Sequence, residues 1–231
     1  MNTGSHFHKQ MQEVKSDLLR MAGLVEEAIH DSSSALARRD AELAMTVISK
    51  DRPIDMMQNQ IEERCIALLA TQQPVAVDLR FLSAVIKICA YLERMGDQAV
   101  NIAQRSLALK ELLPTEVPPT ILDMAEISQD MARACMDALA NGDLQLVCKV
   151  LARDKDLDDL NRQVLEDMVE WMATEQRLIR RGVEFILAAR HYERVGDEAT
   201  NIAEEVVFLV EGRIIRHQGG MEPREPDANA C

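Results

Sequence analysis

The segment ERMGDQAVNIA at residues 93–103 returns one hundred positions later as ERVGDEATNIA at residues 193–203. The two segments are identical at eight of eleven positions, and each places a glutamate, an aspartate and an asparagine at four-residue spacing. Because residues four apart lie on the same face of a helix, each segment predicts a row of polar side chains. A polar pattern that occurs twice in this way indicates an internal duplication and marks where the chemistry of the protein is expected.

The duplication extends beyond these two segments. A shift of 103 places residues 47–61 over residues 150–164, with acidic and apolar positions in register. Three residues are missing near 72–74, after which the shift becomes 100. Each half is therefore expected to be a three-helix unit, and the pair a tandem repeat.

Glycine and proline are sparse, and their positions predict six long helices. The first helix is expected to begin near His8, and the six helices are expected to end near residues 37, 70, 113, 140, 174 and 215. The apolar residues of the first helix recur at alternating spacings of four and three, which is typical of a helix-packing seam. The expected fold is all-α: two tandem, pseudo-symmetric three-helix bundles made of six long antiparallel helices. The bounds that we expect are a first bundle at 8–113, a proline-containing linker at 114–119, a second bundle at 120–216 and a mobile tail at 217–231.

Two aspartates occupy positions where the helix seams should be apolar. They are Asp51 in the second helix and Asp154 in the fifth, and they align with each other under the shift of 103. An unpaired buried carboxylate costs several kcal/mol, so each of them needs a partner. A metal ion held between helices would supply one, and the residues that we expect to hold it are Asp51, Asp55, Glu93, Asp97 and Asn101 in the first half and Asp154, Asp158, Glu193, Asp197 and Asn201 in the second.

This ligand set consists of oxygen atoms only, which suits magnesium, manganese, calcium or iron better than structural zinc. Gly96 and Gly196 stand where bulkier seam residues are expected. Because a glycine inside a helix costs up to about 1 kcal/mol relative to alanine, its recurrence predicts a close approach between helices.

Three other interpretations remain open. The carboxylates could be neutralised by arginines, namely Arg80, Arg94, Arg180 and Arg194. The chain could also be a helical adaptor without metal. A di-iron carboxylate oxidase or ferritin-like protein would need Glu-x-x-His on two helices, and Glu27 with His30 is the one such match, with Asp130 and Arg133 in the partner position.

The formal charge of −13 argues against a protein that binds nucleic acid, because such a protein needs a basic face. Residues 1–9 contain no apolar region typical of a secretory signal, and no apolar run approaches the roughly 20 residues of a membrane span. These features favour a cytoplasmic protein. No glycine-rich phosphate loop or catalytic Ser/His/Asp set is present, so we expect no enzymatic activity.

With Asp51…Asp55 and Asp154…Asp158 each followed by Glu-Arg-x-Gly-Asp-x-x-x-Asn, the chain closely resembles the PhoU family of phosphate-transport regulators. The resemblance covers about residues 11–218 and includes Gln73-Pro74 with Asp78-Leu79-Arg80. It implies two three-helix bundles whose E(D)xxxD motifs bind metal, with manganese, magnesium, iron and zinc not distinguished, at the ten residues named above. Pro53, between Asp51 and Asp55, departs from the family pattern and makes the second-half site the stronger candidate.

The resemblance also implies a function. Proteins of this family are non-enzymatic regulators that couple the ATPase of the phosphate ABC importer to a sensor histidine kinase. They restrain import and repress the phosphate-starvation response when phosphate is plentiful. The expected partners are therefore that ATPase, the histidine kinase and a second copy of the chain in a homodimer, with the membrane reached only through partners.

Overall fold

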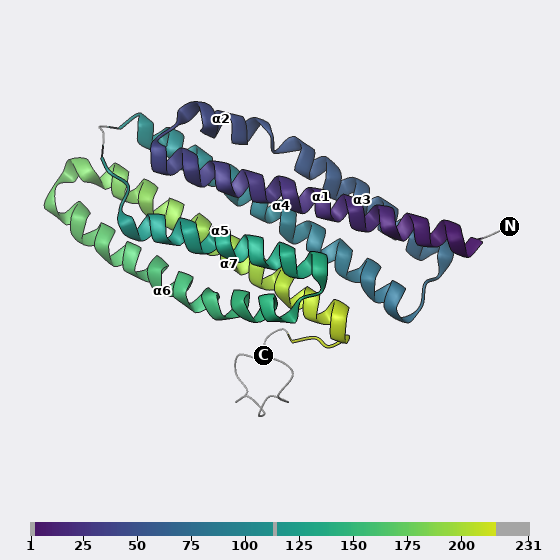
Figure 1. Ribbon diagram of the computed structural model, residues 1–231. Helices are drawn as coiled ribbons and strands as arrows, with labels where there is room; N and C mark the ends of the chain where they lie inside the picture. Colours follow the sequence, from purple (N-terminus) through teal and green to yellow (C-terminus); the bar gives the residue numbers. More distant parts are fainter. Residues whose placement is uncertain (1–2, 113–114, 216–231) are drawn as a thin grey trace, which may run out of the picture.

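The computed structural model describes residues 3–112 and 115–215, and in this part of the chain every regular element is a helix (Figure 1). The elements are α1 (Thr3–Arg38), α2 (Ala41–Ser49), α3 (Arg52–Gln72), α4 (Ala76–Lys110), α5 (Pro119–Asn141), α6 (Leu144–Thr174), the short 3₁₀ helix η1 (Gln176–Leu178) and α7 (Ile179–Glu211). They run side by side along one long axis. The all-α architecture with two groups of three rods is confirmed, one rod being divided into α2 and α3.

The division between α2 and α3 corrects the expected continuous helix at 41–70. Pro53 has no N–H group, and its ring clashes with the carbonyl of the residue four positions earlier, so the helix ends at Ser49 and restarts at Arg52. Pro53 then lies in the first turn of α3, where its missing N–H is not needed. Asp51 between the two helices keeps helical dihedral angles (φ −68°, ψ −45°), so it stays one turn before Asp55.

The two halves repeat their turns as well as their helices. Asp40 begins α2, and its carboxylate accepts hydrogen bonds from the backbone N–H groups of the second and third residues of that helix. Asp143 begins α6 in the same way. The residue before each aspartate has positive φ: 56° at Arg39 and 67° at Gly142. These equivalent turns lie 103 residues apart, the shift that aligns the two sequences.

Small differences from the expected ends have local causes. Helix α3 ends at Gln72, two residues beyond the expected end near 70, and is followed by Gln73 in a left-handed conformation (φ 46°). Helix α4 then begins at Ala76. Helix α7 ends at Glu211 rather than near residue 215, because the next residue, Gly212, is also left-handed (φ 73°). The expected tail at 217–231 lies outside the described residues, as do positions 113 and 114 at the expected boundary. Among the helices that the structure describes, none combines the length and apolarity required to cross a bilayer.

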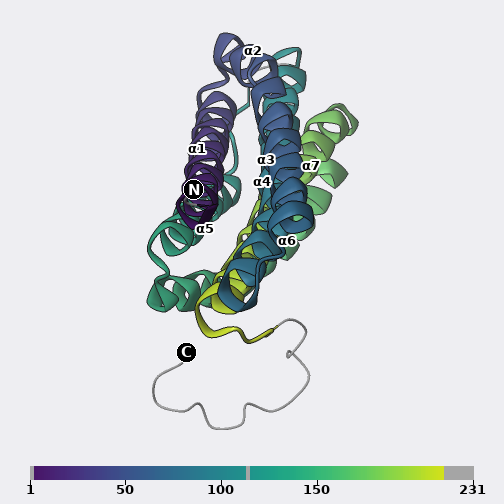
Figure 2. The ribbon, with the colours of Figure 1, turned by 90° about the vertical axis from the view of Figure 1, so that its right-hand side faces the viewer.

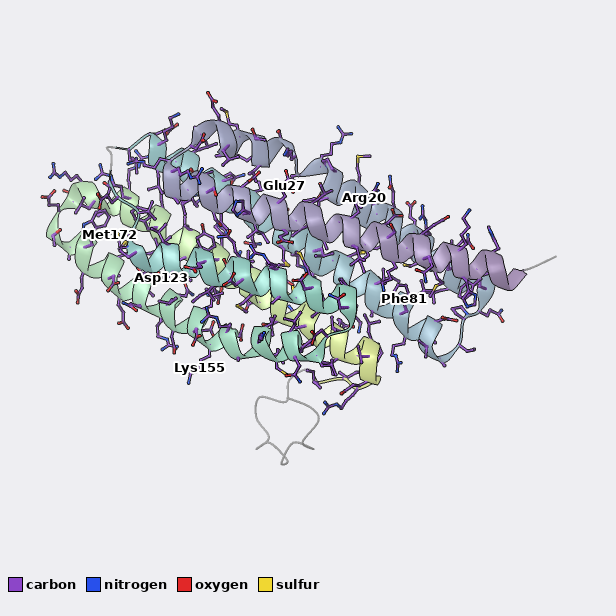
Figure 3. All side chains as sticks on the ribbon, viewed as in Figure 1. Arg20, Glu27, Phe81, Asp123, Lys155 and Met172 are labelled. Carbon is purple, nitrogen blue, oxygen red and sulfur yellow. The ribbon has the colours of Figure 1, made fainter. Side chains whose placement is uncertain are left out.

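The two halves share one core. Antiparallel α4 and α7 form the most extensive contact between them, and α1 also touches α5. Viewed along the molecule, α3, α4, α7 and α6 gather on one side, while α1 and α5 lie on the other (Figure 2). The seam residues of α1 from Val14 to Ile29 are buried as the spacing predicts, in a cluster continuous with the apolar residues of α5, α6 and α7. Figure 3 shows that polar side chains instead project outward along the whole length of the bundle.

Candidate metal centres

Each half places its four acidic residues on two adjacent helices. In the first half, α3 contributes Asp55 and the residue before its first turn, Asp51, while α4 contributes Glu93 and Asp97. In the second half, α6 contributes Asp154 and Asp158, and α7 contributes the remaining pair. We call these groups the first acidic cluster (Asp51, Asp55, Glu93, Asp97) and the second acidic cluster (Asp154, Asp158, Glu193, Asp197).

The glycines of the repeated segments make the close approach possible. A Cβ atom on Gly96 would lie 3.3 Å from Ile54 Cδ1 of α3, and one on Gly196 would overlap Leu157 Cδ2 of α6. Ile54 and Leu157 are equivalent in the two halves. The predicted helix contact is thus confirmed at both glycines, and it brings α4 and α7 against the helices that carry the aspartates.

Carboxylates of the first acidic cluster disfavour one another's ionisation. Burial raises the pKa of Asp51, and the charges of Asp55 and Asp97 raise it further. Burial is also the main cause of the raised pKa of Glu93, followed by Asp97 and Asp55. The pKa of Asp97 rises through burial and then through the charge of Asp55. Asp51 therefore still belongs to the cluster despite the helix break at Pro53.

Three carboxylates of the second acidic cluster also have raised pKa values. Burial and then Glu193, Asp154 and Asp158 raise the pKa of Asp197 to about 6. Burial, with a smaller contribution from Asp158, raises the pKa of Asp154, although a hydrogen bond from Thr200 opposes the shift. Burial likewise raises the pKa of Glu193 against the opposing charge of Arg190. A cation between these carboxylates would relieve all three shifts.

Glu193 carries a carboxylate oxygen without a partner. Its Oε1 atom accepts a hydrogen bond from Arg190 Nη1 at 3.0 Å. Its Oε2 atom is buried and, among the residues that the structure describes, has no hydrogen-bond donor. Because leaving a charged oxygen buried and unpaired is costly, this atom fits a metal ligand.

The clusters lie nearer the surface than the seam pattern predicts. Asp51, Asp154, Glu93 and Glu193 are partly buried, but Asp97, Asp197 and Asp158 are exposed. Within residues 3–112 and 115–215, no three His, Cys, Asp or Glu side chains converge closely enough to enclose one ion. The donor set consists of oxygen atoms, which are the ligands that a hard cation prefers.

The asparagines are placed less favourably. Asn201 donates a hydrogen bond from Nδ2 to Glu198 Oε2 at 3.2 Å, so its amide nitrogen is engaged outside the second acidic cluster. Asn101 is partly buried at the equivalent position of α4. Both asparagines remain predicted ligands of lower weight than the carboxylates.

Arginines do not neutralise the clusters in the way that the alternative interpretation requires. Arg94 pairs with Glu198 across the contact between α4 and α7, with Nη1 and Oε1 3.6 Å apart. In the described part of the chain, Arg80, Arg180 and Arg194 form no ion pair with either cluster, although Arg194 lowers the pKa of Glu193 slightly through its charge. Among the arginines of residues 3–112 and 115–215, Arg190 is the one that pairs directly with a cluster carboxylate.

Two residues that contact the second acidic cluster occur in that half only, so aligning the two halves of the sequence could not identify them. Arg190 aligns with Ala90, and Thr200, whose Oγ1 donates to Asp154 Oδ1 at 3.2 Å, aligns with Val100. The spacing of Arg190 and Glu193, three residues apart on one helix, is the sequence signal that could have identified the first.

The residues of the expected di-iron alternative do not converge. Glu27 Oε1 pairs with Lys50 Nζ at 2.8 Å, whereas His30 Nδ1 lies 3.1 Å from Gln129 Oε1 of α5. Arg133, in the expected partner position, pairs with Glu26 at 3.1 Å. The Glu-x-x-His match is thus used in contacts between helices.

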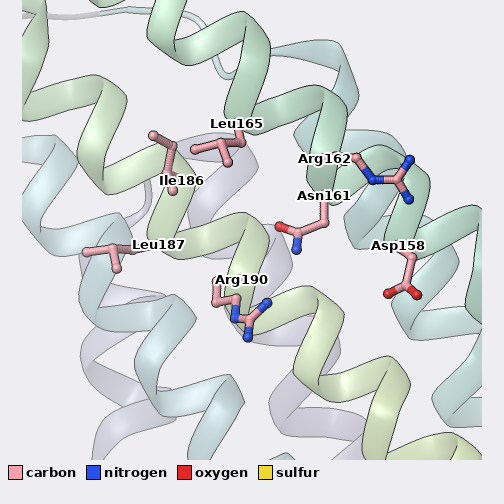
Figure 4. A pocket seen from close by; sticks show the side chains of 7 residues that line it. All are labelled: Asp158, Asn161, Arg162, Leu165, Ile186, Leu187 and Arg190. Carbon is pink, nitrogen blue, oxygen red and sulfur yellow. The ribbon is translucent and has the colours of Figure 1, made fainter.

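A shallow groove of about 430 Å³ adjoins the second acidic cluster between α6 and α7 (Figure 4). It begins at Asp158 and Arg190 and continues away from the cluster over aliphatic side chains.

Known proteins resemble the chain over nearly its whole length. The model of the PhoU domain matches twice, at residues 18–106 and 121–206. A phosphate-specific transport system accessory protein PhoU homolog from Aquifex aeolicus is 39% identical, over 91% of this chain and 95% of that protein. The corresponding homolog from Pseudomonas putida is 38% identical, over 92% of this chain and 84% of that protein.

Two crystal structures have the same fold. PhoU from Pseudomonas aeruginosa superposes with a TM-score of 0.85 at 37% identity, covering 90% of this chain and 100% of the other. The phosphate transport system regulatory protein PhoU from Streptococcus pneumoniae gives 0.82 at 29% identity, covering 90% and 99%. With both halves matched and the architecture shared, the chain belongs to the PhoU family.

Proposed function

We propose that this chain is a non-enzymatic regulator of phosphate uptake and signalling. It acts at the cytoplasmic face of the membrane, where it couples the ATPase of a phosphate ABC importer to a sensor histidine kinase. When phosphate is plentiful, it restrains import and represses the phosphate-starvation response. The observation that carries the proposal is the match of both halves to the PhoU family, whose relatives bear the name of phosphate transport accessory proteins.

The architecture suits an adaptor. Long helices around one continuous core form a stiff body with an extended surface, on which two partners can bind at separate places. A homodimer is part of the proposal, since it would present each partner surface twice. The membrane is reached only through these partners.

Metal ions are the proposed ligands of both acidic clusters. Bound cations would offset the burial and the mutual repulsion that raise the carboxylate pKa values, and would join α3 to α4 and α6 to α7. Glu193, with its unpartnered Oε2 atom, is the proposed central ligand, and Asp154, Asp158 and Asp197 are the further proposed ligands. Manganese, magnesium and iron all suit these oxygen donors.

The test combines Glu193→Gln with Asp197→Asn, which keep side-chain size and remove two charges. The matched control is Asp156→Asn on α6, whose carboxylate pairs with Arg153 at the surface. Titration of chelator-treated protein with Mn²⁺ should show weaker binding by the double variant and unchanged binding by the control. In cells lacking the natural copy, the double variant should leave a phosphate-starvation reporter active in high phosphate.

The two readouts separate the two parts of the proposal. Equal Mn²⁺ binding by the double variant and the wild type would remove the metal sites. A starvation reporter that stays repressed when the whole chain is deleted would remove the regulatory function.

A further inference from the structure

The groove between α6 and α7 continues into a larger apolar surface. Figure 4 shows Leu165, Ile186 and Leu187 on one side of the groove and the side chains of Asn161 and Arg190 directed toward one another on the other side. Leu165 is 48% exposed and Leu187 37% exposed. Val183, one turn before Leu187 on α7, is 42% exposed. Neighbouring exposed aliphatic side chains of this kind are a common mark of an interaction site.

The fold itself does not require this apolar surface. In the first half, which has the same architecture, the residues equivalent to Leu165, Val183 and Leu187 are Glu62, Ser83 and Lys87. The arginines also differ, because Arg162 and Arg190 align with Asn59 and Ala90. The second half therefore carries a groove chemistry that its repeat lacks, and a role beyond helix packing accounts for the difference.

The charges around the groove indicate its occupant. Along α7 the exposed positions at spacings of three and four include Arg180, Val183, Leu187, Arg190 and Arg194, in a chain of net charge −13. This arginine stripe ends at Asp197 of the second acidic cluster, and Asp158 lines the same end of the groove, so the basic side chains border its apolar part. Arg162 of α6 also lines the groove, with its guanidinium on the side of Asp158 (Figure 4).

The groove arginines retain hydrogen-bonding capacity. Arg162 donates to Asp159 at 2.9 Å and Arg190 to Glu193 at 3.0 Å, each through a single bond on an exposed side chain. A guanidinium has five N–H donors, and exposed ion pairs are weak, so both arginines can also bind an incoming carboxylate.

We infer that this groove binds an amphipathic helix of a partner protein whose apolar face is bordered by acidic residues. Two aliphatic or aromatic side chains one turn apart would cover Leu165, Val183 and Leu187, and carboxylates beside them would meet Arg162 and Arg190. A basic helix would place its positive charges against the arginine stripe of α7 and would be repelled. The inference rests on the proposed adaptor function and assigns one partner surface to the second half.

The probe is a fluorescent helical peptide of about 18 residues, with leucines on one face and glutamates along its borders. Two control peptides carry lysine in place of glutamate, or serine in place of leucine. The groove variant Leu165→Glu/Val183→Ser/Leu187→Lys introduces the residues that the first half has at these positions. Ile66→Glu, at a 58% exposed aliphatic residue of α3, is the matched control.

The wild type and Ile66→Glu should bind the glutamate peptide alike, and the groove variant should bind it at least about tenfold more weakly. Both control peptides should also bind the wild type about tenfold more weakly. Absence of binding to the wild type, equal binding by the groove variant, or equal or stronger binding of the lysine peptide would overturn the inference. Sedimentation adds one more outcome: a wild-type dimer that the groove variant converts to a monomer would assign the groove to a second copy instead.

This experiment is independent of the metal sites. Mn²⁺ titration of the groove variant should match that of the wild type, and the variant should fail to repress the starvation reporter. Repression that persists in the groove variant would overturn the partner surface while leaving the proposed regulatory function intact.

Discussion

Asp197 makes the stability of the metal-free protein depend on pH. Its pKa is raised to about 6, against 3.8 in the unfolded chain, so between these values the folded state binds more protons. Its contribution to stability therefore falls as the pH rises from about 4 to about 6. Asp197→Asn should stabilise chelator-treated protein at about pH 7.5 and have little effect at about pH 4. Urea unfolding at both pH values measures this, and an equal effect at the two would contradict it.

The wild type must be compared with Asp197→Asn at each pH, because His191 changes the stability with pH in the opposite direction. Burial and the charge of Arg105 lower the pKa of His191 to about 4, so its contribution to stability is lost as the pH falls from about 6.5 to 4. The difference between the wild type and Asp197→Asn at each pH cancels the histidine contribution, as long as His191 keeps its contact with Gln98, where Nδ1 and Oε1 lie 2.9 Å apart.

The two segment glycines should respond differently to alanine. At Gly196 the added Cβ would overlap Leu157 Cδ2, so Gly196→Ala should lower the free energy of unfolding by about 1–3 kcal/mol. At Gly96 the nearest atom is 3.3 Å away, on the flexible end of Ile54. The gain in helix propensity, up to about 1 kcal/mol, should offset most of that crowding. Chemical denaturation measures the free energy of unfolding of both variants. A larger decrease for Gly96→Ala than for Gly196→Ala would show that the helix contacts differ from those described.

At the scale of the helix, the effect of Pro53 can be tested by comparison with the equivalent position in the second half. Asp156 of α6 is the equivalent residue and lies inside an unbroken helix. Asp156→Pro should cost about 3 kcal/mol, because it removes an internal hydrogen bond and introduces a clash. Pro53→Ala should change stability by less than about 1 kcal/mol, since the first turn of α3 needs no donor there. If both changes proved mild in urea unfolding, proline would not explain the break between α2 and α3.

The same helix shows what the sequence could and could not predict. The sparse placement of glycine and proline predicted six helical rods, and the structure has them, with one rod divided into α2 and α3. The apolar spacing of the first helix predicted its buried face, because burial of a helical stripe is a repeating, local pattern. Pro53 was recognised as a departure, but whether a proline bends a helix or divides it depends on tertiary packing. The pairing of Glu193 with Arg190 was missed because Arg190 is absent from the first half. How far the carboxylates are exposed depends on how α6 sits against α7, which a pattern within one helix does not contain.

For the whole molecule, the union of the two halves depends on the antiparallel pair α4 and α7. Lys87 Nζ of α4 lies 3.2 Å from Oε1 of Glu205, a residue of α7 that is only 2% exposed. Arg105 of α4 binds Glu184 of α7 at 2.9 Å in the opposite part of the contact. These ion pairs cross a contact whose buried residues are largely apolar, so removing one partner should weaken both halves together.

Lys87→Met leaves the buried Glu205 carboxylate without its lysine and should lower the free energy of unfolding by about 2–4 kcal/mol. Lys87→Met combined with Glu205→Met should recover much of that loss, because two apolar side chains can fill the same space without a buried charge. Urea unfolding of the wild type, both single variants and the double variant completes the cycle. Since one core runs through the molecule, each protein should unfold in a single transition. A second transition in Lys87→Met would instead mean that each half is stable without the other, and that α4 and α7 join two independent bundles.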